Sequence, residues 1–186
     1  MESYQLPQFS PYLSCVHVAL YTDVSSPDLL RKRLITASAA EGIDGERERE
    51  AINFSFVEAR LITSLTHLQT AIYQAILAES QGCLRTKSVH SEIIWALNPT
   101  NNISEAMRRY GVSDTTTSLI VVRVADIQKK MDIIVKGNKS PFTALQTLTD
   151  WPAIKKYHKL GNEVAINRAV INNIVVSSVA MKSVMA

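Results

Sequence analysis

The C-terminal run NEVAINRAVINNIVVSSVAMKSVMA places the strongest constraint on how this chain folds. No Gly or Pro follows Gly161, so the run predicts one long helix. Its apolar triplets, 164–166, 169–171, 174–176 and 179–181, are separated by polar pairs. Five residues advance a helix by well over one turn, so the triplets spread around the helix instead of forming one narrow stripe.

Two interpretations of segment 162–186 stay open. It is either a central helix packed on all sides by its own chain, or a helix that offers part of its apolar surface to a partner. A membrane span is a weaker alternative, because a span needs about 20 predominantly apolar residues. Four polar residues interrupt this run: Asn172, Asn173, Ser177 and Ser178.

The rest of the chain mixes strands and helices without regular βαβ alternation, which favours an α+β fold. We expect one domain, 1–186, with a small mixed or antiparallel sheet packed with several helices and a long C-terminal helix. Residue spacing predicts strands over 14–24, 52–62 and 118–124, and helices over 26–42, 63–80, 88–97, 125–135 and 150–161. The helix caps are predicted at Ser26, at Ser64 or Thr66, at Ser88 and at Asp150. Segment 42–50, with alternating Glu and Arg, is interpreted as a charged surface loop.

Composition narrows the functional class only slightly. The hydrophobic share of 46% and the charged share of 20% are those of an ordinary globular domain. A net charge of +3 is compatible with a phosphate-bearing partner without requiring one. Cys15 and Cys83 form no close-spaced motif, so neither a disulfide framework nor a zinc site is indicated. The N-terminal stretch lacks the pattern of a signal peptide, so we expect a protein of the nucleus and cytoplasm.

The motifs of common enzymes are missing from the sequence. The 6 glycines are scattered singly, and none belongs to a phosphate-binding loop. The histidines form no metalloprotease-like pair, and His90 with Glu92 is interpreted as a surface pair without a chemical role. We therefore expect no catalytic residue, no cofactor and no metal.

The stretch NPTNNISEAMRRYG, Asn98 to Gly111, joins two predicted helices. Asn102 is predicted to cap the second helix, with Glu105 as its capping-box partner. Capping leaves Asn101 without a structural role. Just upstream, Arg85 and Lys87 lie close to a helix start, where free backbone N–H groups favour an anion; a solvated basic loop is the alternative.

The segment RTKSVHSEIIWALNPTNNISEAMRRYGVSDTTTSLIVVRV, Arg85 to Val124, resembles the central signature of the TPRKB family, the kinase-binding subunit of the KEOPS (EKC) complex. That family has a segment like HSEIIWALNP, an asparagine-rich turn, an ISEA helix ending in aromatic–Gly, and an apolar strand. The resemblance extends more weakly to 52–76 and to the final helix. The insert 42–50 and the stretch 136–151 depart from it.

The resemblance implies a non-catalytic subunit of the machinery that makes N6-threonylcarbamoyladenosine in tRNAs that read ANN codons. Its direct partner would be the small atypical kinase or ATPase subunit of KEOPS. The threonylcarbamoyl transferase and other KEOPS subunits would be indirect partners, and the 3′ CCA end of tRNA would also bind. No membrane is implied.

The same resemblance assigns candidate site residues. At the tRNA end, Arg85, Lys87 and Arg108 would meet phosphates, while Asn101, Asn102 and Ile103 would meet unpaired bases. The kinase interface would use five residues of the final helix: Ile166, Val170, Ile171, Ile174 and Val175. Two alternatives are a stand-alone enzyme with a dispersed small-molecule site and a structural adaptor without RNA contact.

Overall fold

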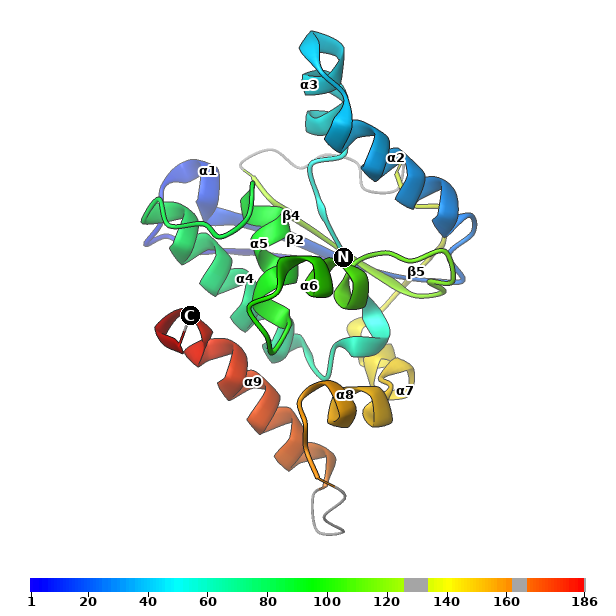
Figure 1. Cartoon of the computed structure of the whole chain (residues 1–186). Coiled ribbons are helices and arrows are strands. Elements are labelled where there is room, and N and C mark those ends of the chain that lie inside the picture. The colour runs from blue at the N-terminus through cyan, green and yellow to red at the C-terminus, as the bar shows by residue number, and fades with distance from the viewer. Residues whose placement is uncertain (126–133, 162–166, 186) are drawn as a thin grey trace.

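An antiparallel sheet lies at the centre of the molecule (Figure 1). The computed structural model describes residues 1–125, 134–161 and 167–185. Within these residues the sheet has five strands in the order β1-β2-β4-β3, with β5 also paired to β2. The strands are β1 (Glu2–Gln5), β2 (Cys15–Thr22), β3 (Ser55–Glu58), β4 (Leu119–Val124) and β5 (Asn138–Ser140). Each of the strand pairs is antiparallel, which confirms the α+β class with a small sheet.

The alternation of β2 separates two hydrophobic cores. Val16, Val18 and Leu20 face one core, and Ala19 and Tyr21 face the other, because successive side chains of a strand point to opposite faces. The larger core is closed by α4 (Leu65–Ser80), α5 (Val89–Leu97) and α9 (Arg168–Met185). The smaller core contacts α2 (Pro27–Ala39) through Leu30.

Serine caps fix the starts of the two helices that cover the sheet. The Ser64 hydroxyl accepts a hydrogen bond from the His67 N–H at 3.1 Å, as predicted for the start of α4. At α5, Ser88 accepts from the Ser91 N–H, and the Ser91 hydroxyl accepts from the Ser88 N–H. Both helices therefore begin where the sequence predicts.

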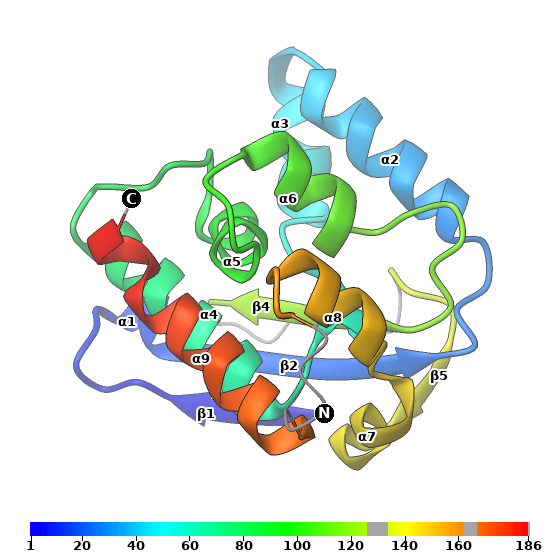
Figure 2. The ribbon, with the colours of Figure 1, turned by 60° about the horizontal axis from the view of Figure 1, so that its bottom comes forward.

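The C-terminal helix α9 packs on α4 and α5, outside the sheet (Figure 2). Ile171, Val175 and Val179 are buried in the larger core, whereas Val170 and Ile174 are exposed. A central helix packed on all sides is therefore the wrong interpretation. The first residues of the predicted helix, 162–166, lie outside the described residues.

The prediction of a charged surface loop over 42–50 is wrong, because these residues form the helix α3 (Gly42–Ala51). It pairs with α2, and the two project from one end of the molecule (Figure 1). Arg33 of α2 contacts Glu48 at 2.5 Å, and Arg49 donates to the Ala37 carbonyl. These contacts to α2 hold a helix that has no apolar stripe of its own.

Two other predictions differ from the structure, and one is not tested by it. Ser26 precedes α2 but adopts a left-handed conformation and makes no side-chain cap. The predicted strand 52–62 shortens to β3, because a 3₁₀ turn, η1 (Ala59–Leu61), follows at once. Most of the predicted helix 125–135 lies outside the described residues.

The short elements complete the fold: α1 (Pro11–Ser14), α6 (Ile103–Tyr110), η3 (Phe142–Ala144), α7 (Leu145–Leu148) and α8 (Trp151–Tyr157). The Asp150 carboxylate accepts from the Ala153 N–H at 3.0 Å, so Asp150 caps α8 as predicted. In the described part of the chain, no helix combines the length and the apolar character that a membrane crossing requires.

Candidate functional site

The turn between α5 and α6, residues 98–102, is called the elbow here. Asn98 is fully buried, and its side-chain amide donates to the Thr100 carbonyl at 3.1 Å and to the Thr100 hydroxyl at 2.8 Å. The Asn98 amide oxygen accepts from Arg109 of α6. Because a buried amide must satisfy its hydrogen bonds locally, Asn98 fixes the path of the elbow.

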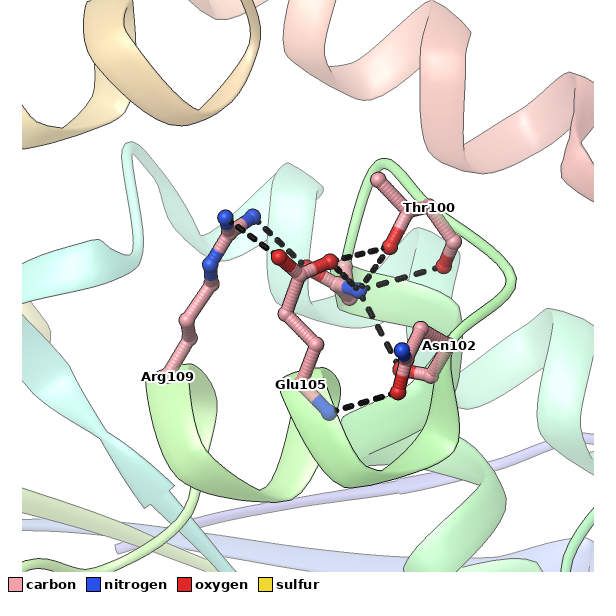
Figure 3. Close-up of polar contacts among 5 residues, drawn as sticks. Thr100, Asn102, Glu105 and Arg109 are labelled. Atoms are coloured by element: carbon pink, nitrogen blue, oxygen red, sulfur yellow. Dashed lines mark hydrogen bonds and ion pairs between the residues drawn. The ribbon is translucent and has the colours of Figure 1, made fainter.

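Asn102 caps α6, as its position in the sequence predicts: its side-chain oxygen accepts from the Glu105 N–H at 2.9 Å (Figure 3). The capping box is not formed, however. The Glu105 carboxylate accepts from the Thr100 hydroxyl and pairs with Arg109 at 2.6 Å. The hydrogen bond from Thr100 lowers the pKa of Glu105, and Asn98 and Arg109 act in the same direction. This carboxylate therefore joins the elbow to α6 instead of closing a cap.

Lys182 of α9 fixes the other side of the elbow. Its buried ammonium group donates to the carbonyl of Trp95, to that of Asn98 at 2.6 Å, and to that of Thr100 at 3.1 Å. It also lies 3.9 Å from the centroid of the Trp95 ring. Burial lowers the pKa of Lys182 to about 8, and the Glu92 carboxylate acts in the opposite direction. The Lys182 ammonium group thus supplies hydrogen bonds to the carbonyl groups at the end of α5.

Trp95 completes this arrangement, because its indole N–H donates to the Asn101 carbonyl at 3.2 Å. The Asn101 backbone is held, whereas its side chain is exposed and makes no hydrogen bond within the described residues. Asn101 therefore presents an amide with free donors and acceptors on a fixed backbone.

The loop that carries Arg85 is held by a buried carboxylate. Glu92 accepts from the Arg85 N–H at 3.1 Å, and from the Thr86 N–H at 2.8 Å and hydroxyl at 2.6 Å. His90 is also buried, and its Nε2 accepts from the Val124 N–H at 3.0 Å. The interpretation of His90 and Glu92 as a surface pair is therefore wrong, since each organises the backbone of a different segment.

A pocket of about 240 Å³ opens at the elbow, lined by Arg85, Trp95, Asn101 and Ile103. A second pocket of about 310 Å³ lies between α4, α5 and α9 and shares Arg85 and Trp95 with the first. A cation, a free amide and an apolar side chain here surround one space. That combination suits a phosphate with a flat unpaired base.

Three of the six predicted RNA contacts line this pocket: Arg85, Asn101 and Ile103. Asn102 is exposed beside it, with its side-chain oxygen committed to the cap. Lys87 and Arg108 are exposed and lie outside the lining. The sequence analysis did not identify Trp95 as a pocket residue. A Trp in an apolar helix is more simply interpreted as part of the core than as the wall of a pocket.

Among the described residues, no group of three or more His, Cys, Asp or Glu side chains could hold a metal ion.

The second candidate surface is the outer side of α9. An exposed apolar stripe is formed by Val170, Ile174, Met181 and Val184, with exposed fractions of 42%, 38%, 55% and 84%. Spacings of four, seven and three residues place these side chains on one face of a helix. This set is called the α9 stripe here.

The predicted kinase-contact residues divide between the two sides of α9. Val170 and Ile174 belong to the α9 stripe, whereas Ile171 and Val175 are 2% and 0% exposed. The latter two pack in the chain's own core and are not available to a partner that docks on this fold, which corrects their assignment. Ile166 lies outside the described residues.

Comparison with known proteins connects this architecture to a family. Residues 21–183 match the family described as kinase binding protein CGI-121. The chain belongs to the CGI-121 family. This confirms the resemblance that the central segment shows. Among curated relatives, the EKC/KEOPS complex subunit CGI121 of Cryptococcus neoformans is 32% identical over 99% of this chain and 100% of its own length.

Two other CGI-121 relatives match most of this chain. The EKC/KEOPS complex subunit cgi121 of Aspergillus fumigatus is 32% identical, over 87% of this chain and 84% of its own length. The subunit of the same name in Yarrowia lipolytica is 26% identical, over 96% of this chain and 98% of its own length. The match to the Cryptococcus relative, over 99% of this chain, extends over both candidate surfaces.

The neighbouring asparagines of the elbow provide a matched pair for stability. Asn102→Ala is expected to lower the free energy of unfolding by roughly 1 kcal/mol, because α6 loses its cap. Asn101→Ala removes an exposed side chain without a hydrogen bond, so its effect should stay within about 0.5 kcal/mol. Urea denaturation of both variants measures the difference, and equal losses would contradict the different roles of the two residues.

Proposed function

We propose that this chain is a non-catalytic accessory subunit of the EKC/KEOPS complex that binds the small kinase or ATPase subunit directly. The observation that carries the proposal is the α9 stripe, an apolar surface on a helix whose opposite side already covers the core. Contiguous exposed apolar surface marks a protein interface. The family's description as kinase-binding agrees with such an interface, and the relatives' names supply the complex.

The elbow pocket is assigned to the 3′ CCA end of tRNA. Arg85 carries a charge for a phosphate, Asn101 offers an amide to a base edge, and Ile103 gives a base an apolar surface. Lys87 and Arg108, outside the pocket, would meet phosphates further along the strand. In this role the chain brings tRNAs that read ANN codons to the complex in the nucleus and cytoplasm, for N6-threonylcarbamoyladenosine formation. The threonylcarbamoyl transferase subunit performs the chemistry and is an indirect partner.

The RNA assignment is tested on a single-stranded oligonucleotide that ends in CCA. Arg85→Glu combined with Asn101→Ala is expected to weaken its binding at least about tenfold, because both a charge and an amide leave the pocket. Fluorescence anisotropy with the purified full chain measures the affinity. Co-purification with the kinase subunit should be unchanged, because neither residue belongs to the α9 stripe.

Lys32→Glu is the matched control for charge, since Lys32 lies on α2 and outside the lining of the elbow pocket. Unchanged affinity in the pocket variant would refute the RNA assignment and favour a structural adaptor without RNA contact. A wild-type chain that fails to bind the kinase subunit would refute the subunit role. Turnover of a small molecule by the chain alone would favour the enzyme alternative.

A further inference from the structure

Ion pairing differs between two pairs of helices, α2 with α3 and α6 with α8. At α2 and α3, the side chains of Arg31, Lys32, Arg33 and Arg47 each contact a carboxylate. At α6 and α8, four cations make no ion pair among the described residues: Arg108, Lys155, Lys156 and Lys159. Segment 151–161, which contains the three lysines, has no Asp or Glu at all. The three lysines therefore have no carboxylate partner in the described chain, whereas Arg108 forms no ion pair but lies near enough to Glu105 to lower the pKa of that carboxyl.

The four cations belong to α6, to α8 and to the turn that ends α8, and the two helices touch. The Arg109 guanidinium lies 4.4 Å from the centroid of the Tyr157 ring, and the Tyr110 hydroxyl is 3.4 Å from Nε2 of His158. Figure 2 shows α6 beside α8, with the elbow at the other end of α6. The set of Arg108, Lys155, Lys156 and Lys159 is called the α6–α8 cationic surface here.

Lys159 occupies a backbone position that favours glycine. The Leu160 N–H donates to the Lys155 carbonyl at 2.9 Å, and the Lys159 N–H donates to the Lys156 carbonyl at 3.3 Å. This pair of hydrogen bonds is the Schellman motif, which ends a helix with a residue in the left-handed conformation. Lys159 has a φ of 53°, where a side chain costs free energy and glycine does not. The chain thus carries an exposed charge at a position where its side chain is disfavoured.

We propose that the α6–α8 cationic surface binds phosphates in the paired acceptor part of an RNA whose single-stranded 3′ end occupies the elbow pocket. This inference rests on the function proposed above and extends it to a second contact. Cationic side chains that form no ion pair suit the sequence-independent recognition of a phosphodiester backbone.

The continuity of the two surfaces favours RNA over an acidic protein as the partner. Ile103, the first residue of α6, lines the elbow pocket, while Arg108 is in its last turn. The 8 residues of α6 extend about 12 Å. A strand that leaves the pocket along α6 therefore reaches the cationic surface within a few nucleotides.

The test compares two RNAs on the full-length chain: an intact tRNA and a short single-stranded oligonucleotide that ends in CCA. A triple variant, Lys155→Gln, Lys156→Gln and Lys159→Gly, is expected to bind the tRNA about tenfold more weakly near physiological salt. The slope of log affinity against log salt should decrease by about one for each phosphate that the variant no longer neutralises. Binding of the oligonucleotide should change less than about twofold, since the pocket is intact.

The single variant Lys159→Gly distinguishes a loss of RNA binding from a loss of stability. It should melt at the same temperature as the wild type or higher, because glycine accepts the left-handed conformation, and should still bind tRNA more weakly. Lys32→Gln on α2, where Lys32 lies beside Asp28, is the matched control and should leave tRNA affinity unchanged.

Three results would overturn the inference: unchanged tRNA affinity in the triple variant, equal weakening for both RNAs, or loss of kinase binding with RNA affinity unchanged. The last would identify a surface for an acidic protein. Failure of the proposed function looks different, because the wild-type chain would then bind neither RNA.

Discussion

Replacing Val170 and Ile174 together by aspartate is expected to abolish capture of the kinase subunit and to leave the chain folded. Both side chains belong to the exposed α9 stripe, so the substitutions remove apolar contact area and introduce charge into the proposed interface. An affinity loss of at least about 30-fold is expected for central interface positions. The melting temperature should change little, because both residues are already in contact with solvent.

Substitutions at the neighbouring positions Ile171 and Val175 are expected to unfold the chain instead of acting on the interface. Ile171→Asp and Val175→Asp place a carboxylate in the core between α9 and α4, where these side chains are 2% and 0% exposed. Each should lower the free energy of unfolding by about 4 kcal/mol or more, since a buried charge has no partner there. Loss of kinase binding by these variants would report unfolding and would not map an interface.

Ile35→Asp is the matched control, because Ile35 is an exposed isoleucine on α2, away from the α9 stripe. It makes the same chemical change and should leave kinase capture and stability unchanged. Pull-down by the tagged kinase subunit measures binding, and thermal unfolding of each purified variant measures stability. A folded Val170→Asp/Ile174→Asp variant that the kinase still captures would exclude the α9 stripe as the interface.

Helix starts were predictable because their signals are local. The caps at Ser64, Ser88, Asn102 and Asp150 each need a polar side chain within three residues of the N–H that it accepts from. The same reasoning failed at Glu105, because Thr100 and Arg109 compete for its carboxylate. A local pattern states what a side chain can reach, and the fold decides which contact it makes.

Helix α3 and the elbow depend on contacts that no local pattern contains. The charged sequence of α3 becomes helical beside α2, and Glu50 at its end pairs with Arg123 of β4 at 3.1 Å. The elbow depends on Lys182, which is 87 residues from Trp95 in the sequence. The family resemblance pointed to the pocket residues Arg85, Asn101 and Ile103. Only the fold shows that α9 contributes the cation behind them.

One buried and one half-buried histidine, His67 and His158, predict a loss of stability in mild acid. His67 is fully buried; its Nδ1 accepts from the Thr63 N–H at 3.3 Å, and its Nε2 has no partner among the described residues. Burial lowers the pKa of His67 to about 3, and the nearby His158 adds to this shift. Burial, aided by Arg109, lowers the pKa of His158 to about 4.

The direction of the change in stability with pH follows from proton uptake by the unfolded chain. Between pH 6.5 and about 4 the unfolded chain binds protons at both imidazoles, whereas the folded chain does not. The free energy of unfolding therefore falls as the pH decreases from 6.5 towards 4. Two units below the unfolded pKa, each histidine should contribute a loss of roughly 2 to 3 kcal/mol.

Urea denaturation between pH 7 and pH 4.5 measures this loss, and His67→Gln combined with His158→Gln supplies the comparison. The double variant should be less stable than the wild type near neutral pH, because glutamine fills the buried sites imperfectly. Its stability should nevertheless depend much less on pH, since neither glutamine titrates. Tyr110→Phe, which keeps both imidazoles but removes the hydroxyl beside His158, should keep the wild-type slope. If the double variant also kept that slope, other groups would have to cause the acid sensitivity.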